Sequence, residues 1–331
     1  MAICMTLSAL LTKSLAAQSV RGVVLDSSGA PVPFAIVTLA DSSRAVLTDS
    51  RGLFHITDLA RGRYGVRVRQ IGFRPVDREM EASEPLAAVR DTFRLDRLAV
   101  MLEAVSVGPT AACRQTGFAS ANGGAAAQLF DQLSLNTQRW MMIRAAAPDS
   151  IRYEQIRSYH GPDGTLLGEK TDTVSRASVR PEKYQPGAML RQGSNGQMTL
   201  VIPAIDELGD ARFLKTHCFR YVAQESLGAR SAHRIDFEPA DDLTGVDVRG
   251  SVWLDTESSF LLQIEYHITG MDTPPRGVGA YKPVVKSTFV IGSDGAPRLA
   301  TGTIAQQLRK SRFQGKEATL SLTRDRLLDK F

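Results

Sequence analysis

Apolar and polar residues alternate with a period of two over several short segments near the start of the chain. The alternation is clearest over 20–25, 35–39, 53–57 and 64–69, and turns rich in Gly, Asp and Ser separate these segments. Alternation of this kind is typical of half-buried strands, and strands spaced by about 8–12 residues predict an antiparallel β-sandwich. The Ala-Pro-Val-Pro segment at 30–33 is predicted to lie at a sheet edge or in an entry loop, because proline has no N–H to donate.

The same alternation returns in the second half of the chain, where it predicts a long hairpin. Apolar residues occupy every second position of Val246–Asp255 and again of Phe260–Thr269, and Asp-Thr-Glu-Ser at 255–258 turns the chain between them. One face of the hairpin is therefore apolar and the other polar, as in an antiparallel sheet that covers a core on one side. Further strands are predicted over 151–159, 232–238, 284–292, 300–308 and 317–324.

One helix is predicted between the two β-rich parts. Over 125–135, apolar residues such as Leu129 and Leu133 recur at helical spacing, and Asn122 is placed to cap the first turn. A large sheet with one apolar face needs a cover, and this helix, together with the Pro-Pro-Arg-Gly loop at 274–277, is predicted to supply it. The predicted fold class is mainly β.

Composition limits the class of protein without naming a function. The chain has 331 residues, enough for two domains, and its 43% apolar and 23% charged residues are ordinary for a globular protein. The net charge of +5 is spread along the strands, so no clustered footprint for nucleic acid is predicted. No stretch approaches the ~18 continuous apolar residues of a membrane span.

The first residues resemble an export signal. Residues 1–11 are mostly apolar, and Leu-Ala-Ala-Gln at 15–18 offers small residues for cleavage, although Lys13 follows the apolar run instead of preceding it. We predict a signal peptide over 1–18, and hence an exported protein that is periplasmic or associated with the outer membrane. A frayed cytoplasmic N-terminus is the alternative.

Cysteine usage agrees with export. Cys4 would be removed with the signal peptide, which leaves Cys113 and Cys218. An even pair in an exported chain predicts a disulfide, and two buried thiols that never meet are the alternative. His217 adjoins Cys218, but further ligands at regular spacing are missing, so no metal site is predicted.

Five short motifs carry a family resemblance. They read V-x-G-x-V-x-D from Val20, P-V-x-x-A-x-V-x-L from Pro31, T-D-x-x-G-x-F-x-I from Thr48, L-x-x-G-x-Y from Leu59, and a closing Gly-Phe at 72–73. Residues 19–107 thereby resemble the carboxypeptidase regulatory-like domain, a transthyretin-like β-sandwich of many secreted and outer-membrane proteins. The resemblance implies the fold and export. It names no ligand, because the family is an accessory module in peptidases, receptors and adhesins alike.

The motifs of common enzymes are missing from the sequence. It has no Gly-x-Ser-x-Gly elbow, no His-Glu-x-x-His, no phosphate-binding loop and no dinucleotide fingerprint. A zinc carboxypeptidase would need His-x-x-Glu, whereas His55, His160 and His233 are each followed three residues later by Asp. Glu265 and His267 share one strand face, which makes an acid–base pair feasible and marks a candidate functional polar face. We predict no catalytic residues, no cofactor and no enzyme.

The second half of the chain resembles another group of envelope proteins. A sheet covered by a helix is similar to the half-barrel of bacterial lipoprotein carriers of the LolA/LolB type, in which a curved sheet wraps a hydrophobic cavity. The phrases GSVWLDTESSFLLQIEY and FLKTHCFRY resemble the C-terminal part of uncharacterised envelope proteins that follow a regulatory-like domain. We therefore predict a linker and helix over 108–150, after a boundary at Gly108-Pro109, and a curved antiparallel sheet over 151–331.

Three hypotheses for function follow. In the first, a non-enzymatic envelope protein holds an apolar or lipid-like ligand in the half-barrel, while the sandwich docks it to an envelope partner. In the second, a structural or adhesive protein with a solid core recognises carbohydrate or protein through the sandwich loops, which would then carry exposed aromatic residues. The third is a hydrolase of unfamiliar type with polar side chains converging near His267.

Overall fold

The structure, a computed structural model, divides the chain into two compact units that are described separately. The first unit consists of the residues up to Val68 together with Pro75–Leu95, and the second of Arg69–Arg74 with Asp96–Phe331. The structure describes residues 18–40, 44–82, 91–98, 113–114, 116–118, 125–146, 150–177, 182–193, 198–271, 280–292 and 297–328.

Some of the sequence predictions concern other parts of the chain. The signal peptide except for Gln18, the boundary at Gly108-Pro109, the capping Asn122 and the loop at 274–277 all lie outside the described residues. None of the helices in the described part of the chain has the length and hydropathy of a membrane span.

The first unit is built from two small sheets, as the alternation predicts. One sheet has the order β4-β1-β7 and the other β3-β2-β5-β6. Fully buried side chains such as Val24, Val37 and Phe93 form the core of the unit. The strands are β1 (Gln18–Asp26), β2 (Ile36–Leu39), β3 (Ala45–Leu47), β4 (Leu53–Leu59), β5 (Arg63–Arg69), β6 (Val76–Glu81) and β7 (Asp91–Leu95).

A glycine fixes the turn that precedes β4. Gly52 has φ +74°, and a Cβ placed on it would lie 2.3 Å from the carbonyl oxygen of Val24, so no other residue fits. The carboxylate of Asp49 accepts hydrogen bonds from the backbone N–H groups of Arg51 and Leu53 and closes the same turn. This is the T-D-x-x-G motif of the sequence, and its role is structural.

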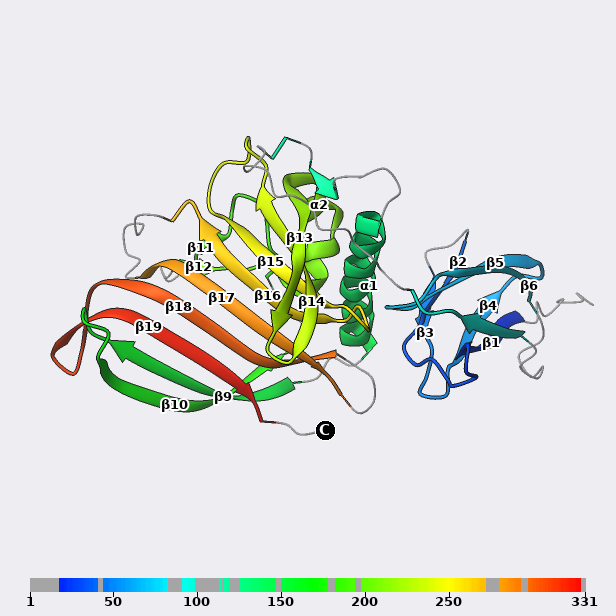
Figure 1. The fold of residues 1–331 in the computed structure, drawn as a ribbon, viewed down its shortest axis with the longest axis horizontal. Coiled ribbons are helices and arrows are strands. Elements are labelled where there is room, and N and C mark those ends of the chain that lie inside the picture. The colour runs from blue at the N-terminus through cyan, green and yellow to red at the C-terminus, as the bar shows by residue number, and fades with distance from the viewer. Residues whose placement is uncertain are drawn as a thin grey trace, which may run out of the picture. The chain divides into compact units, whose positions relative to one another are not determined.

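The second unit is dominated by one curved sheet of ten strands, in the order β10-β9-β19-β18-β17-β16-β15-β14-β13-β8 (Figure 1). The strands are β8 (Gly117–Phe118), β9 (Ser150–His160), β10 (Leu166–Ala177), β13 (His217–Leu227), β14 (Arg230–Pro239), β15 (Asp247–Asp255), β16 (Leu261–Thr269), β17 (Ala280–Ile291), β18 (Pro297–Phe313) and β19 (Lys316–Leu327), with a separate hairpin of β11 (Leu190–Gln192) and β12 (Met198–Leu200).

The predicted hairpin is confirmed as β15 and β16, with Val252 opposite Ile264 and Gly250 opposite Tyr266. Three helical segments accompany the sheet: α1 (Ala125–Ala146), the 3₁₀ turn η1 (Ile205–Gly209) and α2 (Ala211–Thr216). In Figure 1, α1 and α2 lie beside β13–β16, whereas β9, β10 and β19 form the opposite end of the sheet.

The helix α1 is longer than the predicted 125–135. Its apolar stripe is interrupted by Asn136, whose side-chain amide donates to the carbonyl oxygen of Ser259 at 2.9 Å and accepts from the N–H of Leu261 at 2.9 Å. The helix continues beyond Asn136 to Ala146. On this part of it, the ring of Trp140 meets that of Phe289 edge-on, with centroids 5.6 Å apart. Polar residues thus extend the buried side of the helix beyond the point where the hydrophobic pattern ends.

Candidate functional site

Directly paired residues of neighbouring strands share a face, so the register shows what each face of the ten-stranded sheet carries. One row crosses nine strands on the side that α1 and α2 cover, which we call the inner face. It begins with charged residues at the β10 edge and ends in the aromatic core. Its members are Lys170, Arg157, Thr323, Ile304, Val285, Tyr266, Gly250, Phe237 and Phe219.

The next row on the inner face has the same gradient. Asp172, Gln155 and Asp325 lie at the β10 end, and Ile264 and Val252 lie toward β13. Asp325 is only 5% exposed, and Gln155 Nε2 donates to its Oδ1 at 2.9 Å. In these two rows the inner face is therefore mainly apolar from β13 to β17 and polar over β19, β9 and β10.

The apolar half of the inner face is largely filled from within the unit. Leu129, Phe130 and Leu133 of α1 and Phe213 of α2 pack against the sheet in one buried cluster. At the border of this cluster lie half-buried apolar residues, which contact it without being covered by it. They include Trp140 of α1 and Leu299 and Ile304 of β18.

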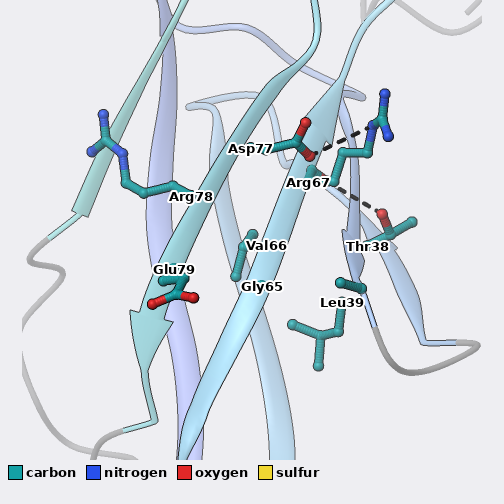
Figure 2. Close-up of a pocket in the computed structure, with 9 residues that line it drawn as sticks. Thr38, Leu39, Gly65, Val66, Arg67, Asp77, Arg78 and Glu79 are labelled. Atoms are coloured by element: carbon teal, nitrogen blue, oxygen red, sulfur yellow. Dashed lines mark hydrogen bonds and ion pairs between the residues drawn. The ribbon is translucent and has the colours of Figure 1, made fainter.

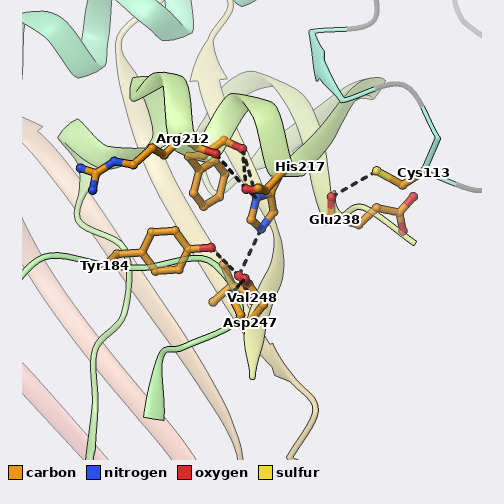
Figure 3. A network of polar contacts seen from close by, with 10 residues as sticks. Cys113, Tyr184, Arg212, His217, Glu238, Asp247 and Val248 are labelled. Carbon is orange, nitrogen blue, oxygen red and sulfur yellow. Dashed lines mark hydrogen bonds and ion pairs between the residues drawn. The ribbon is translucent and has the colours of Figure 1, made fainter. Parts of the chain in front are cut away.

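A buried polar network ties a loop to the sheet (Figure 3). Asp247 Oδ1 accepts hydrogen bonds from the Tyr184 hydroxyl at 2.6 Å and lies 3.2 Å from His217 Nε2, while Oδ2 accepts from the N–H of Gly187 at 2.6 Å. The His217 ring stacks on Phe213, with centroids 3.8 Å apart. The three polar side chains are buried to 4% exposure or less.

Burial and hydrogen bonding act in opposite directions on the carboxylate of this network. Burial alone would raise the pKa of Asp247, but the hydrogen bonds from His217, Tyr184 and Gly187 lower it below the ordinary value. The pKa of the Tyr184 hydroxyl is raised, by burial first and then by its bond to Asp247. A histidine and a carboxylate in contact suggest acid–base chemistry, but their burial leaves no access for a substrate, so the network anchors the 182–193 segment.

The predicted polar pair lies on the opposite face of the sheet, which we call the outer face. His267 Nε2 lies 2.8 Å from Glu265 Oε1, and the two side chains are 44% and 28% exposed. Lys286 and Ser251 are the cross-strand neighbours of Glu265. The structure thus brings the two residues together on an open surface, and their functional role stays a prediction.

The two cysteines are joined. Cys113 and Cys218 form a disulfide with Cα atoms 5.7 Å apart, across 105 residues of sequence. The backbone N–H of Cys113 also donates to the Asp241 carboxylate, and the N–H of Asp241 donates to the carbonyl oxygen of Cys113, both at 3.2 Å. The disulfide fixes the segment that precedes α1 to strand β13.

No metal centre accompanies these groups in the described part of the chain, where no three His, Cys, Asp or Glu side chains come together closely enough to hold an ion. The three His-x-x-Asp pairs of the sequence are therefore not parts of such a cluster. His233 is 3% exposed on the inner side of β14, and burial lowers its pKa while the charge of Asp255 opposes that shift.

The first unit offers a shallow groove of about 660 Å³ across β2, β5 and β6, lined by both charged and apolar side chains (Figure 2). Gly65 forms part of its floor, and an Arg67–Asp77 ion pair of 3.6 Å crosses one side. The four aromatic residues of this unit, Phe34, Phe54, Tyr64 and Phe93, are buried or half-buried. The exposed aromatic rings expected of a carbohydrate platform are therefore not found among the described residues of this unit.

Comparison with known proteins supports the family resemblance of the first unit. Residues 19–95 match the family model of the carboxypeptidase regulatory-like domain, which confirms the resemblance carried by the motifs. A search of curated proteins found no match.

Three solved structures are similar to the chain at low identity. A DUF1329 family protein from Desulfovibrio piger has a TM-score of 0.31 and 9% identity, over 60% of this chain and 90% of that one. A putative outer membrane lipoprotein-sorting protein domain from Vibrio parahaemolyticus has a TM-score of 0.30 and 10% identity, and the match covers 60% of this chain and 92% of that one. A LolA superfamily protein from Nitrosomonas europaea has a TM-score of 0.24 and 11% identity, and the match covers 55% of this chain and 87% of that one.

Proposed function

We propose that the protein is an exported, non-enzymatic binding protein that holds a lipid-like molecule against the inner face of its second unit. The observation that carries the proposal is that the apolar inner surface of the sheet is larger than the area that α1 and α2 cover. The apolar inner surface continues past the core filled by α1 and α2 to the half-buried Trp140, Leu299 and Ile304. Contiguous accessible apolar surface on a concave face is the usual property of a ligand site.

Two further observations support the proposal. The Cys113–Cys218 disulfide fits export, because such bonds persist in oxidising compartments and are rare in the cytosol. The polar groups that resemble catalytic ones are either buried, as in the His217–Asp247 pair, or exposed on an open face, as in Glu265 and His267. Neither arrangement brings an acid–base pair together with a confined substrate pocket.

The proposal is tested with a neutral apolar probe and two variants on opposite faces of one strand. Binding of N-phenyl-1-naphthylamine to the full protein is followed by its fluorescence. Ile304→Asn removes a half-buried apolar side chain from the inner face, and Thr303→Asn makes the matched change on the outer face. Loss of one such contact, about 1.5 kcal/mol, corresponds to roughly tenfold weaker binding for the Ile304 variant alone.

Two results would contradict the proposal. One is the absence of saturable probe binding by the unmodified protein. The other is an equal effect of the two variants, which would place the probe elsewhere on the molecule. Native mass spectrometry of the purified protein then provides the chemical class of any molecule that co-purifies and is released on denaturation.

The groove of the first unit favours a second candidate function, recognition of a polar partner such as an extended peptide. Its lining of Thr38, Arg67, Asp77 and Glu79 provides both charges and a hydroxyl around the Gly65 floor. Gly65→Gln would fill that floor, since a Cβ there already lies 3.0 Å from Ala40 Cβ. Loss of an envelope partner in a pull-down with this variant, but not with the Ile304 variant, would favour the second candidate.

A further inference from the structure

The polar end of the inner face contains charges of both signs, and the described residues neutralise only part of them. Asp172 forms an ion pair with Lys170 at 3.2 Å. Asp325 is buried and accepts from Gln155. Both carboxylates are therefore engaged by neighbours on the same face.

Arg157 differs from these groups. Within the described residues its side chain has one hydrogen bond, from Nη2 to Gln155 Oε1 at 3.1 Å. A guanidinium carries five N–H donors, so most of its donor capacity is free. The side chain is half-buried on the inner face, between Lys170 on one side and the hydroxyl of Thr323 on the other.

The position of Arg157 is set by its neighbours. Asp325 Oδ1 accepts a hydrogen bond from Gln155 Nε2, so the amide nitrogen of Gln155 faces Asp325. The amide oxygen of Gln155 then faces Arg157 and accepts from it. Lys170 lies directly opposite Arg157 and is paired with Asp172, whereas Arg157 has no carboxylate partner among the described residues. An anion bound beside Arg157 would supply that missing partner.

Distance along the row connects this cation to the apolar surface. Ile304 lies two strands from Arg157, with Thr323 between them. Neighbouring strands are ~4.8 Å apart, so the two side chains are separated by roughly 10 Å. A molecule with an anionic head and an apolar chain can contact both at once.

We propose that the ligand of the inner face is a long-chain carboxylate, with its carboxylate bound by Arg157, assisted by Lys170 and Thr323, and its chain against Ile304 and Leu299. A planar guanidinium matches a carboxylate through two parallel hydrogen bonds, which favours this head over a neutral one. This inference rests on the proposed function and adds the chemistry of the head.

The test compares a fluorescent long-chain acid with its methyl ester, which keeps the chain and removes the charge. Cis-parinaric acid and methyl cis-parinarate are titrated into the full protein, into Arg157→Gln and into Arg324→Gln. Arg324 is an exposed residue of the neighbouring strand β19 and lies on the outer face, so it serves as the matched control.

We expect the unmodified protein and Arg324→Gln to bind the acid about tenfold or more tightly than the ester, since hydrogen bonds to charged groups are the strong ones. Arg157→Gln should lose that preference while still binding the ester, which also shows that the variant is folded. Lys170→Gln should reduce the preference in part.

The contrary results distinguish a wrong carboxylate assignment from a wrong proposed function. Equal binding of acid and ester by the unmodified protein, or a preference that survives in Arg157→Gln, would overturn the carboxylate assignment and leave the proposed function intact. If neither compound binds and N-phenyl-1-naphthylamine also fails to bind, the proposed function itself is wrong.

Discussion

A single carboxylate holds together three separate parts of the second unit. Asp247 receives hydrogen bonds from Tyr184 and Gly187 and contacts His217, and the side chains of Asp247, Tyr184 and His217 are buried. Asp247→Ala leaves buried donors without an acceptor, and breaking a buried charged network costs about 3–5 kcal/mol. We expect urea unfolding followed by circular dichroism to show that loss. Asp242→Ala, at an exposed loop carboxylate, should change stability by less than about 0.5 kcal/mol.

His233 should make the protein sensitive to mild acid. Neither ring nitrogen has a hydrogen-bond partner among the described residues, and burial lowers its pKa below 6.5 in the folded chain. The unfolded chain therefore takes up the proton more readily, so the stability is complete above 6.5 and is lost as the pH falls toward the lowered value.

The measurement is the melting temperature between pH 7.5 and pH 5, for the unmodified protein and for His233→Gln. The variant should flatten the decline in this range, because glutamine does not titrate. His160→Gln, at a half-buried histidine of β9, is the control and should keep the decline. An identical decline in all three proteins would assign the acid sensitivity to other groups.

Local sequence pattern places residues on a face but does not say what covers them. The period-two alternation puts Asp247 on the polar side of its hairpin, and a solvent-facing position there is wrong, since the residue is 2% exposed. The cover comes from Tyr184 and Gly187, about sixty residues earlier in the chain. By contrast, Glu265 and His267 are predicted to share a face, and they contact each other because both lie on one strand.

At the scale of elements, the disulfide joins the segment that precedes α1 to strand β13. The Cys113–Cys218 bond closes a loop of 105 residues, for which the chain-entropy model predicts up to ~4.7 kcal/mol of stabilisation. Reduction by dithiothreitol should therefore lower the melting temperature. The Cys113→Ser/Cys218→Ser double variant should melt at the temperature of the reduced protein and show no response to reductant. A response in that variant would indicate an unrelated effect of the reagent.

Elements with a buried face are predicted more accurately than those without one. The β15–β16 hairpin has an apolar side throughout and is found where the alternation places it. Strand β10 has no such side, because it lies at the sheet edge and most of the described side chains on it are exposed, and the sequence pattern misses it. Strand β18 continues to Phe313, beyond the predicted 300–308, for the same reason.

At the scale of the whole molecule, the candidate site depends on the order of the strands. Lys170, Arg157, Thr323 and Ile304 are neighbours only because β19 lies between β9 and β18. Each strand taken alone shows polar and apolar positions, but the gradient from charge to apolar surface exists only across the assembled sheet. For this reason the sequence predicts an apolar face and does not predict its polar end.

The same strand order predicts where a bound ligand protects the full chain. Hydrogen exchange measured by mass spectrometry, with and without N-phenyl-1-naphthylamine at about a hundred times its Kd, should slow in β18 and its neighbours β17 and β19, because binding at that excess stabilises the folded state by about 2.7 kcal/mol. Strands β2 and β5 of the first unit, which line the groove, should exchange unchanged. Protection confined to β2 and β5 would instead place the probe in the groove and contradict the proposed site. Since both sets of peptides come from one digest, each serves as the internal control for the other.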